Sequence, residues 1–292
     1  MIDWITDPLT HGITQRALIE IAILGVVSGA VGCWVVLFGI SYSAESLAHG
    51  MFPGLVGAAL LGIPLLLGGA AGILLAALLI ALAGRFSLDS ADTDIAVVVT
   101  TLFGLGVLMA LSPESPPGIQ SLLFGDPLAV TFGQLLATGL LGAVILTVLW
   151  FGHDRLLATG FDGGSRGGMS AGSARILLLV LVAATVLVGV QGLGNLLVAA
   201  ILVGPAAAAR LLTSRMSSMI PLSVGIAVVS GFAGLYLSYH GRIAAGAAIV
   251  ACLILSFAVC ALISTLPARR PARPDVTSSG RKDPVVQPWT GR

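Results

Sequence analysis

Charged residues are scarce in this 292-residue chain, and lysine is nearly absent. Aspartate, glutamate, lysine and arginine make up 9% of the residues, whereas an average soluble domain has about 25%. Hydrophobic residues make up 57%, and the mean hydropathy is +1.05. This composition excludes a soluble protein and predicts an all-α polytopic membrane protein. The net charge of +1 gives no reason to expect a nucleic-acid partner.

The sequence also lacks the motifs of nucleotide hydrolysis, of a disulfide framework and of secretion. A phosphate-binding loop ends in Gly-Lys-Ser/Thr, but the one lysine is Lys282, in GRKDP, so ATP hydrolysis would fall to another chain. Cys33, Cys252 and Cys260 lie in apolar runs, without metal or disulfide spacing, and are expected to be small buried residues. The first fifteen residues lack a basic region before an apolar core, so no cleaved signal peptide is predicted.

Apolar runs separated by helix breakers predict about nine transmembrane helices. They cover residues 17–40, 47–61, 65–83, 95–111, 131–150, 176–190, 195–209, 220–239 and 243–266. The count becomes eight or ten if the short second run or the N-terminal stretch does something else. Two pairs of glycines four residues apart, Gly25 with Gly29 and Gly68 with Gly72, suit close helix contact.

Basic residues predict the orientation. If the tail after Leu266 is cytoplasmic, alternation places most of the basic residues inside, and only Arg16 and Arg242 outside. Those inside are Arg85, Arg155, Arg166, Arg175, Arg210, Arg215 and six in the tail (Arg269, Arg270, Arg273, Arg281, Lys282 and Arg292). Residues 1–266 are therefore expected to form one transmembrane domain. The basic tail at 267–292, rich in Pro, Arg and Ser, is expected to be disordered.

The stretch at 192–216, GLGNLLVAAILVGPAAAARLLTSRM, ends an uncharged run that is too long for one membrane crossing. No charged residue lies between Arg175 and Arg210, and one straight helix of that length would span ~50 Å, against ~30 Å for the hydrocarbon core. The run must hold two crossings, with the turn at residues 192–195. The second crossing is expected to end at Gly204-Pro205, where proline would open a short basic helix lying along the membrane face.

Ionisable residues at membrane depth are candidate functional residues. Glu45 and His49, in SYSAESLAHG, are four residues apart and would share one helix face. A carboxylate and an imidazole together suit a divalent cation such as zinc or manganese, although a surface pair that caps the second run has the same spacing. Glu20, near the outer end of the first run, could snorkel to the interface.

Three stretches carry a resemblance to a known family. SYSAESLAHGMFPGL resembles the Asp–Ala–Leu–Ser–His…Pro–Gly stretch of the zinc/manganese/iron-type (ABC-3 family) ABC transporter permeases. LLFGDPLAV resembles their outer-loop motif, and LGNLLVAAILVGPAAAARLLTSR their coupling segment. The order and spacing agree over about residues 15–266. Glu45 takes the place of the family's Asp and His49 that of its His, so the carboxylate sits one methylene further out.

The resemblance implies a fold, partners and roles for residues. It implies a type II ABC importer-like permease that forms a dimer, with two ATPase subunits inside, an extracytoplasmic metal-binding protein outside and no cofactor of its own. Glu45 and His49 would contact zinc, manganese or iron in transit. The coupling role falls on the segment from Gly204 to Arg215, including Pro205, Ala206, Ala208 and Arg210. Two alternatives are a secondary metal transporter or channel, and a permease for a metal chelate.

Overall fold

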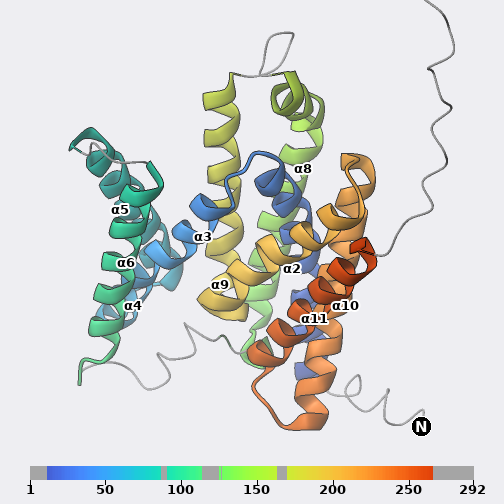
Figure 1. Ribbon diagram of the computed structural model, residues 1–292. Helices are drawn as coiled ribbons and strands as arrows, with labels where there is room; N and C mark the ends of the chain where they lie inside the picture. Colours follow the sequence, from blue (N-terminus) through green and yellow to red (C-terminus); the bar gives the residue numbers. More distant parts are fainter. Residues whose placement is uncertain (1–11, 87–90, 114–124, 126, 163–169, 266–292) are drawn as a thin grey trace, which may run out of the picture.

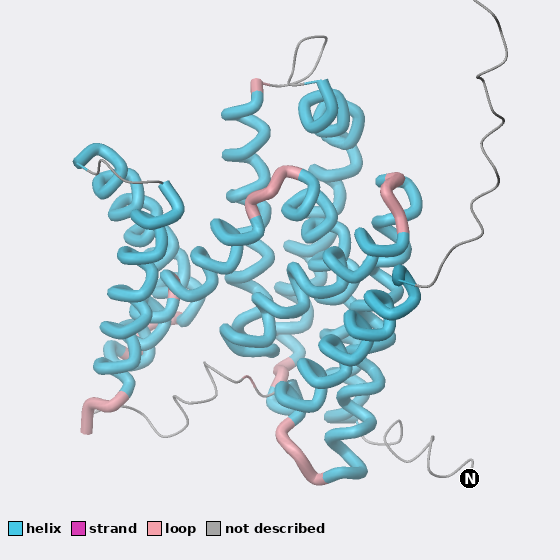
Figure 2. Tube along the Cα trace, in the orientation of Figure 1, coloured by secondary structure: helices cyan, strands magenta, loops and turns pink. Residues whose placement is uncertain are grey.

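The computed structural model describes residues 12–86, 91–113, 125, 127–162 and 170–265, and these ranges are helical almost throughout. Figure 2 shows helices joined by short loops. The α-helices are α2 (Gly12–Leu37), α3 (Ser41–Gly50), α4 (Phe52–Leu61), α5 (Leu65–Phe86), α6 (Ala91–Ala110), α8 (Phe132–Asp162), α9 (Ala171–Leu212), α10 (Met216–Gly241) and α11 (Ala245–Thr265), with a 3-10 turn, η1 (Pro127–Ala129). The basic tail at 267–292 lies outside the described residues.

In the described part of the chain, helical segments correspond to each of the nine apolar runs that the sequence predicts. Seven are long and apolar enough to cross a membrane, because α9 contributes two of them, Ala171–Val190 and Gly192–Leu212. The eighth is α5, whose apolar stretch is shorter, and the ninth is the α3–α4 pair. That pair is broken at Met51, next to Pro53 in the first turn of α4, where a residue without an N–H is tolerated.

The ends of the segments separate the described arginines by side (Figure 1). The end of α8, the start of α9 and the α9–α10 turn lie in the upper part, whereas the α10–α11 turn and the start of α2 lie in the lower part. Arg155, Arg175 and Arg215 belong to the upper set by their places in the chain, and Arg16 and Arg242 to the lower set. This division follows the predicted alternation; that the upper side is cytoplasmic stays a prediction.

The long helix α9 confirms one prediction and corrects another. Its backbone breaks at Gly194, where φ is 74° and ψ is 163°, inside the predicted turn at 192–195. We call the segment Ala171–Val190 α9a and the segment Gly192–Leu212, which contains the break near its start, α9b. The prediction that the second crossing ends at Gly204-Pro205 is wrong, because α9b continues through Pro205 to Leu212. Membrane helices tolerate an interior proline where neighbouring helices support the freed backbone.

Glycines set the closest helix contacts, and both predicted pairs take part. A Cβ atom on Gly25 or Gly29 of α2 would meet Val228 or Val224 of α10 at 2.9–3.0 Å. A Cβ atom on Gly72 of α5 would lie 2.6 Å from the carbonyl oxygen of Met51. These small residues let the backbones approach, which is a common means of association for helices in lipid.

Candidate functional site

Glu45 and His49 lie on one face of α3, as their spacing predicts. The His49 Nε2 atom is 3.8 Å from Glu45 Oε1, which is ion-pair distance. The Glu45 side chain is 57% exposed and the His49 side chain 22%. The opposite face of α3 is buried through Ala44, Ala48 and Gly50. A Cβ atom on Gly50 would lie 2.7 Å from the Cβ of Ala76, so α3 rests closely on α5. The helix therefore holds the pair at the margin of the core.

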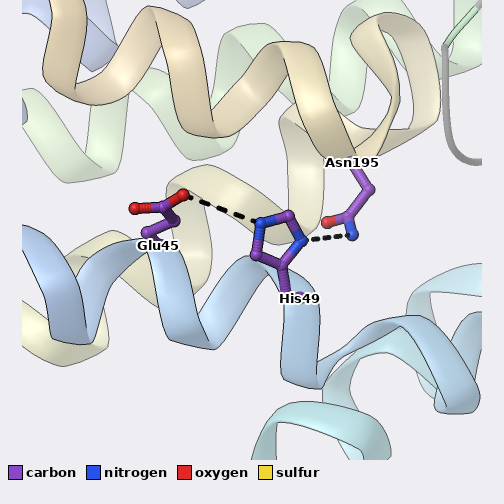
Figure 3. Close-up of polar contacts among 3 residues, drawn as sticks. All are labelled: Glu45, His49 and Asn195. Carbon is purple, nitrogen blue, oxygen red and sulfur yellow. Dashed lines mark hydrogen bonds and ion pairs between the residues drawn. The ribbon is translucent and has the colours of Figure 1, made fainter. Parts of the chain in front are cut away.

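Two other helices hold the His49 ring. Phe103 of α6 contacts it edge to face, with the ring centroids 5.3 Å apart. Asn195 of α9b lies on the other side, with its Nδ2 atom 3.4 Å from His49 Nδ1. Figure 3 shows the imidazole between the Glu45 carboxylate and the Asn195 amide. The sequence analysis missed Asn195, although a lone amide at a helix break in an apolar run was an available signal.

A pocket of about 390 Å³ opens beside Glu45 and His49. Its walls come from α9b and α11, and the apolar residues lining it are Leu196, Ala199, Ala200, Val203, Gly204, Val250, Leu253, Ile254 and Phe257. These residues belong to helices that are long and apolar enough to cross a membrane. An apolar pocket with one carboxylate and one imidazole can supply a cation with only two side-chain ligands, so binding of the cation would be weak.

The predicted coupling residues separate into three groups along α9b. Gly204 lines the pocket and has open space where a Cβ atom would project. Pro205, Ala206 and Ala208 are buried within the chain. Arg210 and Arg215 are exposed, one at the end of α9b and the other in the turn to α10. The structure thus brings Gly204 together with Glu45 and His49, and places the arginines apart from them.

Two alanines of the predicted coupling segment do not lie on the surface of the chain. Ala206 and Ala208 are both 0% exposed, and Gly32 of α2 approaches so closely that its added Cβ would meet the Leu202 carbonyl oxygen and the Ala206 Cβ. The small residues fit α9b against α2. The surface open to a partner is instead the tip at 210–215, where Leu211 is 41% and Leu212 is 38% exposed.

The described residues of the outer-loop motif pack against the α9 break. Gly125 has φ of +74°, and a Cβ atom there would collide with the Leu193 backbone. Its neighbour Asp126 lies outside the described residues. Pro127 of η1 is buried. The two stretches that resemble the family's outer loop and coupling segment therefore meet at Gly194.

Glu20 does not snorkel, contrary to expectation. Its side chain is 1% exposed, and Thr138 of α8 donates a hydrogen bond of 2.9 Å to Oε1. A Cβ atom on Gly192 would lie 3.2 Å from the same oxygen. Packing of α8 and α9 over this part of α2 covers the carboxyl group before it could reach an interface.

Comparison with known proteins agrees with this arrangement. The model of the ABC 3 transport family matches residues 10–264. The manganese transport system membrane protein MntC of Listeria innocua is 30% identical over 258 residues, covering 88% of this chain and 92% of that protein. A probable iron transport system membrane protein of Haemophilus influenzae is 29% identical, covering 86% and 93%.

Solved structures share the fold. PsaBC from Streptococcus pneumoniae, solved in complex with Fab, superposes with a TM-score of 0.81 at 31% identity and covers 89% of this chain and 95% of that chain. An inward-facing transporter assigned to the metal-chelate ABC type gives a TM-score of 0.69 at 14% identity, covering 90% of each chain, and shows the fold alone. The family match, the relatives and the apolar helices lead to one conclusion: this chain is a multi-pass inner-membrane permease that belongs to the ABC 3 transport family.

Proposed function

We propose that this chain is the membrane-spanning subunit of an ATP-driven importer of a divalent metal ion, manganese, iron or zinc. The observation that carries the proposal is the Glu45–His49 pair on the wall of a pocket lined by helices that are long and apolar enough to cross a membrane. An ionisable residue in that position is costly and marks an ion pathway. The names of the relatives support manganese and iron more directly than zinc.

The ligand set suits an ion in transit. Carboxylate and imidazole together accept manganese, iron and zinc. Among the described residues, no group of three or more His, Cys, Asp or Glu side chains could hold a metal ion. Transport requires binding that is weak enough for release, and two ligands from one chain meet that requirement.

A second copy of the chain would complete the pathway. The pocket face includes the exposed apolar residues Leu196, Ile254 and Phe257 together with the exposed Glu45. A carboxylate on such a face is unfavourable against lipid. A two-fold related copy on this face would cover the apolar residues and supply a second carboxylate and imidazole.

ATP would act through α9b. The chain carries no phosphate-binding loop, so the energy must come from ATPase subunits on the cytoplasmic side. The same helix lines the pocket at Gly204 and ends in the exposed tip at Arg210 and Leu211. A displacement of the tip would therefore move a wall of the pocket. On the outer side, an extracytoplasmic metal-binding protein would deliver the ion near η1 and Gly194.

The pocket volume and ligands favour a free ion over a metal chelate. About 390 Å³ holds an ion with several waters, and a chelate that saturates its own metal would have no use for Glu45 and His49. The other alternative, a secondary transporter or channel, requires no ATPase. Metal-stimulated ATP hydrolysis in vesicles, with free and chelated metal compared, separates all three functions.

The direct test is uptake of radioactive manganese by vesicles that contain the assembled transporter. Glu45→Gln and His49→Ala should each lower uptake about tenfold or more, since even supporting residues of metal sites contribute 10–100-fold. Asp154→Asn, which removes an exposed carboxylate on α8, is the matched control and should transport normally. Normal uptake by both pocket variants at equal expression would refute the metal path.

A further inference from the structure

Asn195 is completely buried, one of its polar atoms has no hydrogen-bond partner, and its amide contacts His49, a proposed metal ligand. Its side chain is 0% exposed, and it follows the break at Gly194 directly. The described part of the chain gives its amide one side-chain hydrogen bond, 3.4 Å from Nδ2 to His49 Nδ1. The Oδ1 atom is buried without a partner. Buried polar atoms are nearly always satisfied, so an exception requires an explanation.

A hydrogen bond between these two nitrogens requires one particular tautomer of His49, because an amide nitrogen can only donate. In the arrangement in Figure 3, the Asn195 amide nitrogen donates and His49 Nδ1 accepts. A neutral imidazole then carries its hydrogen on Nε2, and Nε2 faces Glu45 Oε1 at 3.8 Å. In this tautomer the nitrogen next to the carboxylate has no lone pair for a metal ion.

Metal binding beside Glu45 requires the opposite tautomer. Nε2 must present its lone pair, so the hydrogen of the neutral ring must sit on Nδ1 and needs an acceptor there. Rotation of the Asn195 amide by half a turn exchanges Nδ2 for Oδ1 at that position. The oxygen that lacks a partner then accepts from Nδ1–H, which is the arrangement that supports histidine ligands in metal sites.

We infer that Asn195 is a positioning residue whose amide sets the tautomer of His49, donating to Nδ1 in the empty pathway and accepting from Nδ1–H when a divalent metal ion is bound to Nε2. The inference rests on the proposed function of Glu45 and His49. An amide can fill both roles because it has a donor and an acceptor of nearly the same shape.

The place of Asn195 in α9b links this contact to the coupling tip. The residue lies at the broken end of the helix whose other end carries Arg210 and the exposed leucines. A shift of α9b about Gly194 would withdraw the amide from His49. Nδ1–H would then lose its acceptor, and the metal ion would be held less tightly at the moment of transport.

The test measures Zn2+ affinity of the full-length chain, assembled with its partners in nanodiscs, by competition with a fluorescent chelator. Asn195→Leu, which has a similar size and no hydrogen-bonding atom, should weaken binding by about tenfold or more. Asn195→Asp keeps the acceptor and should bind at least as tightly as wild type. If Asn195 only fills space, the buried charge of Asn195→Asp would be the more damaging change, and that order would overturn the inference.

A double-mutant cycle with His49→Ala separates positioning from general damage. Asn195→Leu should have no further effect once the imidazole is gone, because its effect passes through His49. Additive losses would overturn the inference. If His49→Ala alone leaves Zn2+ binding unchanged, the proposed metal path fails; if His49→Ala weakens binding and Asn195→Leu does not, the role of Asn195 alone fails.

A measurement on the wild-type protein remains decisive if a variant does not fold. Nitrogen NMR of histidine labelled with 15N in the ring, with His49 assigned from its loss in His49→Ala, reports which nitrogen carries hydrogen. The Zn2+-loaded protein should show hydrogen on Nδ1 and metal on Nε2. The reverse assignment, metal on Nδ1, would overturn the inference.

Discussion

The two ends of α9b differ in almost every physical respect. At the Gly194 end, Asn195 is completely buried and Gly194 holds a backbone conformation that only glycine adopts readily. At the Leu212 end, Arg210, Leu211 and Leu212 are exposed. Between them Ala206 is buried against α2. One helix thus has one end that is held by packing and another end that is exposed.

Under the proposed function, α9b has two different roles at its two ends. A ligand-positioning end needs its side chains held by packing, and the Phe103 and Asn195 contacts to His49 provide this. A docking end needs exposed side chains that a partner can grip. Because the two ends belong to one helix, a change at either end should affect transport, but by different routes, which the following predictions distinguish.

The largest effect on transport is expected at Gly32 of α2, which packs against the middle of α9b, between its two ends. Gly32→Ala places a methyl group into the Leu202 carbonyl oxygen and against Ala206. Overpacking of this kind costs about 1–3 kcal/mol, and the rigid backbone on the other side leaves little room for relief. The expected result is a lowered Tm in detergent and lost transport. Gly225→Ala, where no atom lies within 4 Å of the new Cβ, should retain both; equal behaviour of the two variants would contradict this packing.

A change at the buried end should come next. Gly194→Ala forces a side chain into φ 74° and ψ 163°, which costs about 1–3 kcal/mol for a residue other than glycine. We expect the break to straighten or shift and carry Asn195 away from His49, so that Zn2+ affinity falls along with transport. Gly133→Ala, in open space at the start of α8, is the control. Unchanged Zn2+ affinity in Gly194→Ala would separate the break from the ligand pair.

Changes at the exposed end should reduce ATPase docking without affecting the metal site. Arg210→Glu combined with Leu211→Asp should weaken pull-down of the ATPase subunit while leaving Zn2+ affinity as in wild type. Charge reversal within an interface costs up to several kcal/mol when like charges meet. Arg242→Glu, in the turn at the opposite end of the bundle, should dock normally.

A lysine at position 210 distinguishes docking from simple charge anchoring. If Arg210 only holds the chain in the membrane by its charge, Arg210→Lys will behave as wild type. If it makes paired hydrogen bonds to the ATPase, lysine cannot replace its planar fork. Full docking by both Arg210→Lys and the Arg210→Glu, Leu211→Asp variant would remove the tip from the coupling pathway.

The smallest effect on transport is expected from two cysteine substitutions, which test which end of the bundle faces the cytoplasm. In a background without Cys33, Cys252 and Cys260, Ala171→Cys and Ile243→Cys should both transport. An impermeant thiol reagent added to intact cells should label Ile243→Cys, in the α10–α11 turn, and spare Ala171→Cys, at the start of α9. Labelling of Ala171→Cys but not of Ile243→Cys would show that the predicted orientation is wrong.

The amino-acid sequence alone determined the class of protein, the helical segments and the pairing of Glu45 with His49 on one helix face. Long apolar runs must lie in lipid as helices, because an unpaired backbone is too costly there. The run between Arg175 and Arg210 is too long for one crossing, which is why the break near Gly194 could be predicted. The spacing of Glu45 and His49 places them on one helix face in any packing. These features depend on residues close together in the chain.

Only the tertiary structure decided what each helix contacts. Pro205 has the local character of a helix start, but α2 packs against this part of α9b at Gly32, and the helix continues to Leu212. Glu20 has the character of an interfacial residue, but α8 covers it and Thr138 donates to it. Asn195 reaches His49 from a distance of 146 residues along the chain. Such contacts follow from shape complementarity between whole helices, which no local pattern encodes.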